Sequence, residues 1–325
     1  MASDNREGVQ DTAEGAPTQH ELEHIFTNAG CVGTLCVQNA AGQVEVTIAP
    51  DQPVVAASVI KVLIAVEVER QITEGRLNPG ERIRLPAQAR TPGPVGFSLY
   101  SDDVDVSLRD LLVPMLTISD NVATDALLAQ VGIASCNATA TALGLRQTVI
   151  EHDLHTMIDS IGQAAGFAGW DALADWGTET HTADEEALIR ERMLTAAAMQ
   201  PQTATHTTAR DMCRLLRLIW TDQAASAEGC HRIRTLMARQ LTRQRLARAF
   251  APPVRVAAKS GSLLGVYRHE IGVIAYPDGR WYSVAVLTQT TNAPVREDAI
   301  NAAIGQAAAR AIQLMALEEH VESGQ

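Results

Sequence analysis

The chain carries its strand-like segments at its two ends and its helix-like segments between them. Near the start, segments 31–38 and 43–49 flank the turn sequence NAAG at 39–42, which is the pattern of a β-hairpin. Near the end, three further strand-like runs read VRVAAKS, HEIGVIAY and WYSVAVLTQ, and the turn PDG at 277–279 joins the last two. A sheet must bury a face against another layer, so this order predicts one sheet built from both termini and covered by helices.

The middle of the chain, from about 107 to 250, is helical by pattern. Apolar residues recur at helical spacing in LRDLLVPMLTI, ATDALLAQVG, NATATALG, TARDMCRLLRLIW and HRIRTLMARQL. The run SVIKVLIAVEVERQI is apolar nearly all round and is followed by Gly75 and by NPG at 78–80, which predicts a buried helix that starts at Ser58. A final helix is expected over about 294–318.

These patterns predict an α/β (α+β) protein. We expect residues 1–20 to form a flexible acidic tail. Segments 21–57 and 251–325 together are predicted to form an α/β subdomain, and 58–250 an all-α subdomain that makes the other wall of a cleft.

Composition limits the classes of partner. The 325 residues include 46% hydrophobic residues, enough for a sizeable core, and the net charge of -12 argues against nucleic acid and anionic membranes as partners. The first twenty residues lack the basic and apolar regions of a secretory signal, and no apolar run reaches membrane-spanning length, so a cytoplasmic protein is expected. The five cysteines show no CxxC spacing, which favours reduced buried thiols over disulfides or a zinc site.

Lysine is rare in this chain and lies beside serine. Of the 26 basic residues only Lys61 and Lys259 are lysines, and each is within three residues of a serine. Unlike arginine, a desolvated lysine can lose its proton. Ser58 and Lys61 are spaced i, i+3 on one helix face, so the amine could act as base for the hydroxyl, with Lys259 as a second cation that lowers its pKa.

Two further motifs surround this pair. Ser119, Asp120 and Asn121 lie between two helical patterns, which presents Ser119 and Asn121 at a helix junction. Lys259-Ser260-Gly261 ends a strand, where Gly261 would let a ligand lie close to the backbone.

Each motif also has a purely structural interpretation. Ser58 would be a helix N-cap, Asp120 and Asn121 a cap and turn pair, and Lys259 a charged residue that protects an edge strand.

Together and in this order, the three motifs resemble those of the active-site serine penicillin-recognising enzymes, most closely the class A β-lactamases, whose signature is S-x-x-K, S-D-N and K-T-G. Ser260 stands where that signature has threonine. The stretches LTISDNVATDALLAQVG, NATATALGL, HTTARDMCRLL and KSGSLLGVYRHEIGVIAY also look like that family, so the resemblance covers roughly residues 20 to 318. It implies a β-lactamase-like fold, with an antiparallel sheet flanked by terminal helices plus an all-α domain, and no metal or organic cofactor.

The resemblance also implies catalytic roles. Ser58 would attack a carbonyl, Lys61 would take its proton, and Ser119 would pass a proton to the leaving group. The backbone N–H groups of Ser58 and Ser262 would form the oxyanion hole, which needs donors aimed at the developing charge.

The binding roles follow in the same way. Asn121 would bind a substrate amide, and Lys259 with Ser260 would hold a substrate anion. Arg268 follows the K-S-G strand by a hairpin and is either a second carboxylate anchor in the cleft or a surface arginine.

One departure from the family changes the functional expectation. Class A β-lactamases carry a glutamate that activates the water that clears the acyl-enzyme, within an E-P-x-L-N run. This chain has no such run, and our alignment places Leu154 where the glutamate would be. Asp153 or His155 could serve as the base instead. The pair His152-x-x-His155 is a metal pair or, more simply, two loop histidines.

The chain is also longer here. From Ser119 to Lys259 is 140 residues (259 − 119), about thirty more than expected for the family. The extra residues fall in an insertion near 155–200, beside the site, where loops usually decide substrate choice.

Three functions are compatible with these observations. The first is a cytoplasmic acyl-transfer enzyme that opens a small-molecule ester or amide through acyl-Ser58 and passes the acyl group to an amine or to water, as in natural-product metabolism. The second is a β-lactamase with a displaced base. The third is a binding protein that keeps the pocket without turnover.

Overall fold

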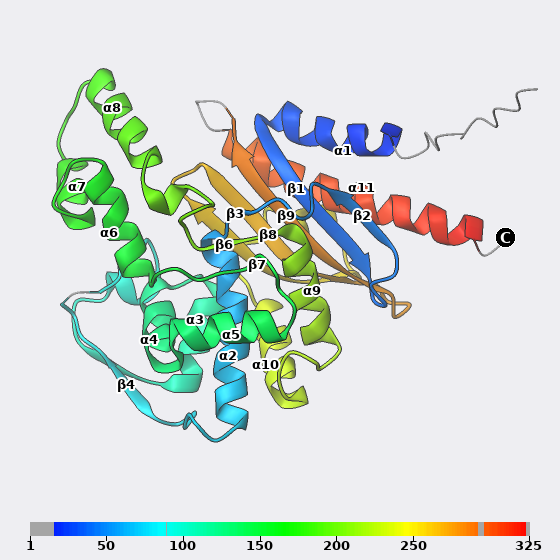
Figure 1. Cartoon of the computed structure of the whole chain (residues 1–325), viewed down its shortest axis with the longest axis horizontal. Helices are drawn as coiled ribbons and strands as arrows, with labels where there is room; N and C mark the ends of the chain where they lie inside the picture. The colour runs from blue at the N-terminus through cyan, green and yellow to red at the C-terminus, as the bar shows by residue number, and fades with distance from the viewer. Residues whose placement is uncertain (1–15, 89, 292–295, 323–325) are drawn as a thin grey trace, which may run out of the picture.

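The structure is a computed structural model that describes residues 16–88, 90–291 and 296–322. Its centre is a five-stranded antiparallel sheet in the order β2-β1-β9-β8-β7 (Figure 1). The strands are β1 (Cys31–Asn39), β2 (Glu45–Ile48), β7 (Arg255–Leu263), β8 (Tyr267–Ala275) and β9 (Trp281–Thr290). Strand β1 pairs with β9 along its whole length, so the predicted single sheet built from both ends of the chain is confirmed.

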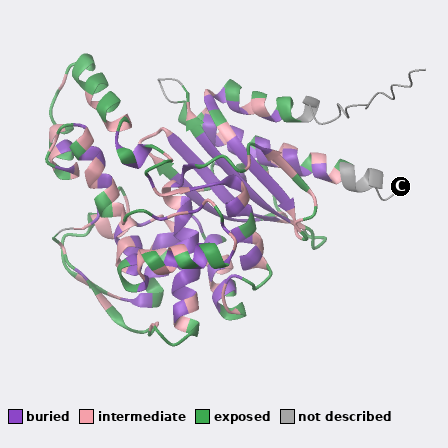
Figure 2. Ribbon diagram, viewed as in Figure 1, coloured by how far each residue is buried: buried purple, intermediate pink, exposed green. Residues whose placement is uncertain are grey.

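Each face of the sheet packs against a helical layer. The terminal helices α1 (Ala16–Ala29) and α11 (Glu297–Glu322) cover one face, where Val284 and Val286 of β9 are buried. The alternate residues Ala285 and Leu287 pack on the other face with α2 (Lys61–Thr73) and α9 (Ala209–Trp220). This alternation follows from the two-residue period of a strand, and Figure 2 shows the sheet buried between the two layers.

The second layer is mainly helical. It begins with a short strand and a 3₁₀ turn, β3 (Val54–Val55) and η1 (Ala57–Ile60), so the α-helix α2 starts three residues after Ser58. The other helices are α3 (Leu108–Thr117), α4 (Asn121–Val131), α5 (Ile133–Ala142) and α10 (Ala227–Met237). Short elements complete it: β4 (Arg82–Leu85), η2 (Gly96–Leu99), β5 (Val104–Ser107), β6 (His206–Thr207) and η4 (Leu246–Ala249).

The segment predicted as an insertion forms three helices, and the last two of them stand out from the rest of the molecule (Figure 1). They are α6 (Leu154–Ala164), α7 (Trp170–Trp176) and α8 (Ala183–Leu194), followed by η3 (Ala197–Met199). Helix α8 begins with a capping box between Thr182 and Glu185, and none of its residues is buried. Local capping, together with one partly buried side, therefore maintains this helix.

The two chain ends differ from expectation in detail. Helix α1 begins at Ala16, inside the segment predicted as a tail, while residues 1–15 lie outside the described residues. The expected start of the last helix, at 294, also lies outside them, and α11 continues beyond the expected end to Glu322. None of the described helices has the length and apolarity needed to cross a bilayer. All five cysteines are buried and free.

Candidate active site

Ser58 lies in the 3₁₀ turn η1, where strand β7 passes close to it. A Cβ placed on Gly261 would lie 3.1 Å from the Ser58 nitrogen and 3.2 Å from the Val59 nitrogen. Glycine at 261 therefore allows β7 to run against the turn. The sequence analysis expected a ligand to lie close to this glycine, and in the structure the backbone of the turn lies close to it. As a result Ser58 and Ser262 line the same pocket.

Lys61 is fully buried, one turn along the helix from Ser58. Its Nζ donates to the backbone oxygen of Ser119 at 2.7 Å, to Oδ1 of Asn121 at 2.8 Å and to Oγ of Ser119 at 3.3 Å. Burial lowers the pKa of Lys61 to about 7, although the charges of Asp120 and Asp125 act to raise it. A neutral amine is therefore accessible at neutral pH, which is what a base for a serine hydroxyl requires.

Ser119, Asp120 and Asn121 occupy the junction between α3 and α4, as predicted. Ser119 has φ of +66°, a left-handed conformation that costs energy in a residue with a side chain and is found at functional sites. Asn121 donates through Nδ2 to the backbone oxygen of Pro92 at 2.8 Å while its Oδ1 accepts from Lys61. The motif therefore holds the lysine amine in place from one side.

Asp120 is a structural residue in this arrangement. It is fully buried and caps α4, with Oδ1 accepting from the Ala123 nitrogen at 2.9 Å and Oδ2 accepting from the Phe97 nitrogen at 2.7 Å. A Cβ on Gly96 would overlap Oδ2 at 1.9 Å. The capping interpretation is thus right for Asp120, and its second oxygen fixes the η2 turn against α4.

Lys259 is also fully buried, and its Nζ donates to the backbone oxygen of Ser260 at 2.7 Å. Burial, together with the positive charges of Lys61 and Arg245, holds the pKa of Lys259 well below its usual value. The charge of Lys61 therefore acts on Lys259, whereas the pKa of Lys61 itself is lowered by burial and not by the second cation that the sequence predicted. A substrate anion placed beside Lys259 would favour its charged form.

A buried polar network behind β7 was not predicted from the sequence. Oε1 of Gln240 accepts a short hydrogen bond from the Ser260 nitrogen, and its Nε2 donates to Glu270 Oε1 at 2.9 Å. Arg245 donates to the Gly261 oxygen at 2.9 Å and to Ser262 Oγ at 2.6 Å. These bonds fix the backbone of the K-S-G strand, and a satisfied buried network of this kind is stiff.

Arg268 was expected to be either a carboxylate anchor in the cleft or a surface arginine, and the structure places it in neither position, because it is buried. Arg268 lies on the face of the sheet covered by α11, where its guanidinium pairs with Glu297 and donates to Asn301 at 3.3 Å. It stands opposite Ser262 in the β7–β8 register. The two-residue period of β8 directs its side chain away from the face that carries Lys259 and Gly261.

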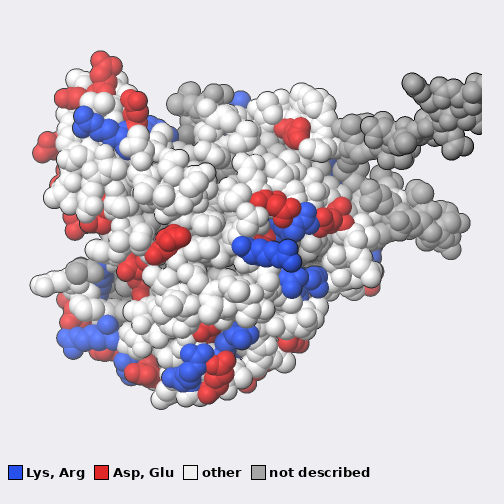
Figure 3. Space-filling model, in the orientation of Figure 1, with Lys and Arg blue, Asp and Glu red and all other residues white. Residues whose placement is uncertain are grey.

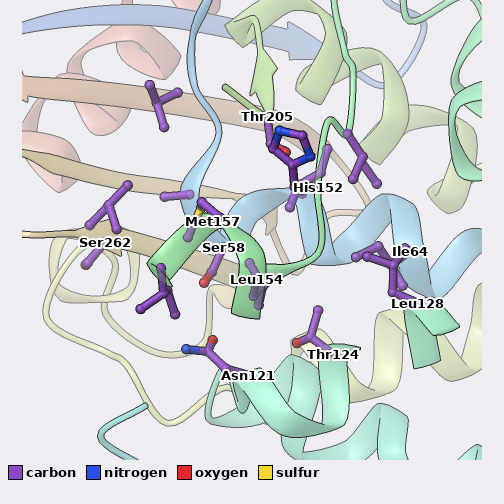
Figure 4. A pocket seen from close by; sticks show the side chains of 16 residues that line it. Ser58, Ile64, Asn121, Thr124, Leu128, His152, Leu154, Met157, Thr205 and Ser262 are labelled. Atoms are coloured by element: carbon purple, nitrogen blue, oxygen red, sulfur yellow. The ribbon is translucent and has the colours of Figure 1, made fainter. Parts of the chain in front are cut away.

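A narrow pocket of about 80 Å³ opens at Ser58. Apolar side chains make up most of its lining. Its polar side chains, all labelled in Figure 4, are Ser58, Asn121, Thr124, His152, Thr205 and Ser262. The apolar lining consists of Val55, Ala57, Ile60, Ile64, Leu128, Ile150, Leu154, Met157, Ile158 and Leu263. Leu154 therefore stands in the pocket with Ser58, and it brings no carboxylate.

The two predicted replacement bases do not line this pocket. Asp153 is the N-cap of α6 and accepts from the Thr156 nitrogen at 2.7 Å, and His155 is exposed. The ionisable side chain in the lining is His152, which the sequence analysis interpreted as half of a metal pair or as a loop histidine, and not as a base. Within the described residues no cluster of three or more His, Cys, Asp or Glu side chains is arranged to hold a metal ion.

The start of α6 is tied to α4 by one carboxylate. Asp125 accepts from the Leu154 nitrogen at 2.8 Å, from the His155 nitrogen at 2.9 Å and from Thr91 Oγ1 at 2.6 Å. Burial raises the pKa of Asp125, and these hydrogen bonds act against that rise. Leu154 is thereby held beside α4 by backbone bonds that do not depend on its own side chain.

Comparison with known proteins agrees with this geometry. A family model described as the beta-lactamase enzyme family matches residues 17–315. The chain is 29% identical over 283 residues to the "Beta-lactamase regulatory protein BlaB" of Streptomyces cacaoi, which covers 83% of this chain and 88% of that protein.

Solved structures show the shared fold. A β-lactamase from Sphaerobacter thermophilus superposes with a TM-score of 0.71 at 21% identity, covering 93% of this chain and 97% of that one. A PBP-A variant in which leucine is replaced by glutamate, solved as an acyl-enzyme complex with penicillin G, gives a TM-score of 0.70 at 20% identity, with coverage of 93% and 97%.

Proposed function

The chain belongs to the beta-lactamase enzyme family, and from this premise we propose that it is a serine acyl-transfer enzyme that forms acyl-Ser58 from a small ester or amide. The acyl group then passes to an amine or to water. The resemblance inferred from the three motifs and the predicted β-lactamase-like fold are both confirmed. The choice of donor and acceptor is the proposal.

Acylation follows from the polar side of the pocket. The Ser58 hydroxyl loses its proton to the neutral amine of Lys61 as its oxygen bonds to the substrate carbonyl carbon. The oxyanion forms beside the N–H groups of Ser58 and Ser262. When the bond to the leaving group breaks, that group receives a proton through Ser119, which Lys61 contacts at 3.3 Å. Lys259 and Ser260 hold an anionic group on the leaving side.

The presence of Leu154 in the pocket is the observation that carries the transfer function. Hydrolysis of an acyl-serine by water needs a base that removes a proton from the water. Beside Ser58 the lining offers Leu154, Met157 and Leu128 instead of a carboxylate. A neutral amine is a stronger nucleophile than water and attacks the acyl carbon without first losing a proton; when the bond to the Ser58 oxygen breaks, the proton that the amine loses returns to that oxygen through Lys61. Slow hydrolysis gives the acyl-enzyme time to be transferred in this way.

Intact-mass spectrometry tests this function directly. The protein and its Ser58→Ala variant would be mixed with a penicillin, a cephalosporin and activated esters, with and without an added amine. We expect a persistent adduct that depends on Ser58 and that the amine removes faster than water does. Rapid turnover of β-lactams without a trapped adduct would contradict transfer and favour a β-lactamase, with His152 as the side chain to test as its base.

A second candidate is a regulatory β-lactam-binding protein. It is favoured by the name of the Streptomyces cacaoi relative and by the same lack of a carboxylate at Leu154. In that case the acyl-enzyme is the final state. The same experiment separates the two, because a sensor would form a β-lactam adduct that amines do not clear.

A further inference from the structure

The inserted helices α7 and α8 enclose an apolar groove of about 300 Å³. Its lining includes Trp170, Trp176, Ile189, Met193 and Leu264, so two of the chain's four tryptophans face this one space. The Trp176 ring is stacked on His181 with 3.7 Å between ring centroids. The aromatic wall is therefore held in place before any ligand arrives.

Helix α8 lines this groove with its apolar side, which is only partly buried. Ile189, Met193 and Leu194 are only partly buried, although they lie on one side of the helix at positions i, i+4 and i+5. Its first turn carries Asp184, Glu185 and Glu186. Figure 3 shows acidic side chains at the outer end of the part of the molecule that contains α8. A helix whose apolar side is only partly buried gains stability when an apolar ligand covers that side.

The groove adjoins the pocket at Ser58, because consecutive residues of the chain line the two spaces. Leu263 lines the pocket at Ser58, and the next residue, Leu264, lines the groove. Met157 of the pocket and Trp170 and Met193 of the groove pack in the same apolar cluster. Leu264 has φ of +50°, a strained conformation that fixes the direction of this turn.

Strand β7 sets the direction in which a substrate would lie. The anion anchor at Lys259 and Ser260 comes first along the strand, the oxyanion donor Ser262 follows, and Leu263 and Leu264 come last. With the scissile carbonyl at Ser262 and the leaving group towards Lys259, the acyl group extends towards the groove.

We propose that the groove between α7 and α8 binds a bulky, uncharged aromatic group on the acyl side of the substrate. This proposal rests on the proposed acyl-transfer function. The sizes of the two spaces support it, because a pocket of about 80 Å³ at Ser58 is too small for a two-ring group and about 300 Å³ is at the lower end of small-ligand sites. The charged residues Glu186 and Arg190 also line the groove, among otherwise apolar neighbours.

Two esters with the same leaving group test the effect on acylation: p-nitrophenyl acetate and p-nitrophenyl 2-naphthylacetate. Ile189→Asn changes a groove residue, and Leu188→Asn is the matched control, since Leu188 is the preceding residue of α8, is 47% exposed and does not line the groove. We expect Ile189→Asn to slow acylation by the naphthyl ester about tenfold and to leave acetylation within about twofold. The control should change neither rate. Equal slowing of both esters by Ile189→Asn, or no slowing, overturns the proposal.

Binding without chemistry separates this proposal from the proposed function. In the Ser58→Ala protein, 2-naphthylacetamide should shift the indole N–H signals of Trp170 and Trp176 in an NMR titration and leave those of Trp220 and Trp281 in place. Ile189→Asn should weaken this binding about tenfold. If the two groove signals do not move, the groove proposal fails whatever the acylation results. If they move but neither ester acylates Ser58, acyl transfer fails and the groove remains an aromatic-binding site.

Discussion

The catalytic stretch of β7 and the arm made of α7 and α8 are neighbours that are built in opposite ways. The backbone around Ser260 and Gly261 is fixed by buried hydrogen bonds from Gln240 and Arg245, 15 to 20 residues earlier in the chain (260 − 240 and 260 − 245). Helix α8 has no buried residue and is maintained by its own capping box and one partly buried side. In the proposed function, the chemistry belongs to the region that buried hydrogen bonds fix, and the choice of substrate belongs to the region that few buried residues hold.

The two regions also differ in how far their charged side chains are buried. Near β7, Lys61 and Lys259 are fully buried, and burial lowers both pKa values. On the arm, charged side chains such as Asp184 are exposed, and the helix packs through partly buried apolar side chains such as Ile189 and Met193. Changes in the first region should therefore alter rate constants for every donor, and changes in the second should alter only the preference among donors.

The largest expected effect is the loss of the base. Lys61→Met keeps the volume of the buried chain but removes the amine that accepts the Ser58 proton. We expect the acylation rate constant to fall by about 10³-fold for small and bulky donors alike. Stopped-flow acylation with an activated ester measures it, and circular dichroism checks that the variant is folded. A loss confined to bulky donors would break the proposed division between the two regions.

Replacing Leu154 should act on the second half of the reaction. In Leu154→Glu the new carboxylate would enter the pocket at Ser58, and we expect hydrolysis of the acyl-enzyme to speed up about 10²-fold while acylation changes little. The decay of the adduct followed by intact mass measures this. Leu154→Gln, which has the same shape without the base, is the control, and an equal gain in that variant would show that pocket polarity, not a base, limits hydrolysis.

Part of the difference between the β7 region and the arm was predictable from the sequence, for reasons that differ from residue to residue. Ser58 and Lys61 are three residues apart, so the local helical geometry is enough to predict that they lie on one side. The rarity of lysine in the chain indicated Lys259 as the third residue. The face of Arg268 was not predictable, because β8 is buried on both sides and shows no apolar alternation. Arg245 was missed since its partner Asn301 is 56 residues away (301 − 245). The helices of the arm were missed because few of their residues are buried.

The pH dependence of acylation should follow Lys61. Its pKa is about 7, lowered by burial, and only the neutral amine accepts the proton from Ser58. Acylation should therefore be constant well above pH 7 and fall about tenfold for each pH unit below it. Single-turnover rates between pH 5 and 9 give the profile. His152→Asn should keep it unchanged, and a profile that disappears with this substitution would assign the base to the imidazole in the pocket.

The smallest expected effect comes from the close approach of β7 to the catalytic turn. A methyl group at position 261 would lie 3.1 Å from the Ser58 nitrogen, so Gly261→Ala forces the strand and the turn apart by a few tenths of an ångström. We expect acylation to slow several-fold for all donors and the free energy of unfolding to fall by about 1 kcal/mol, because a tight contact between backbones relaxes only partly. Urea unfolding and acylation kinetics measure the two effects. If Gly261→Ala instead changed the preference between acetyl and naphthylacetyl esters, the turn at Leu263 and Leu264 would transmit strain from the rigid strand into the groove, and chemistry and substrate choice would not be separable in this chain.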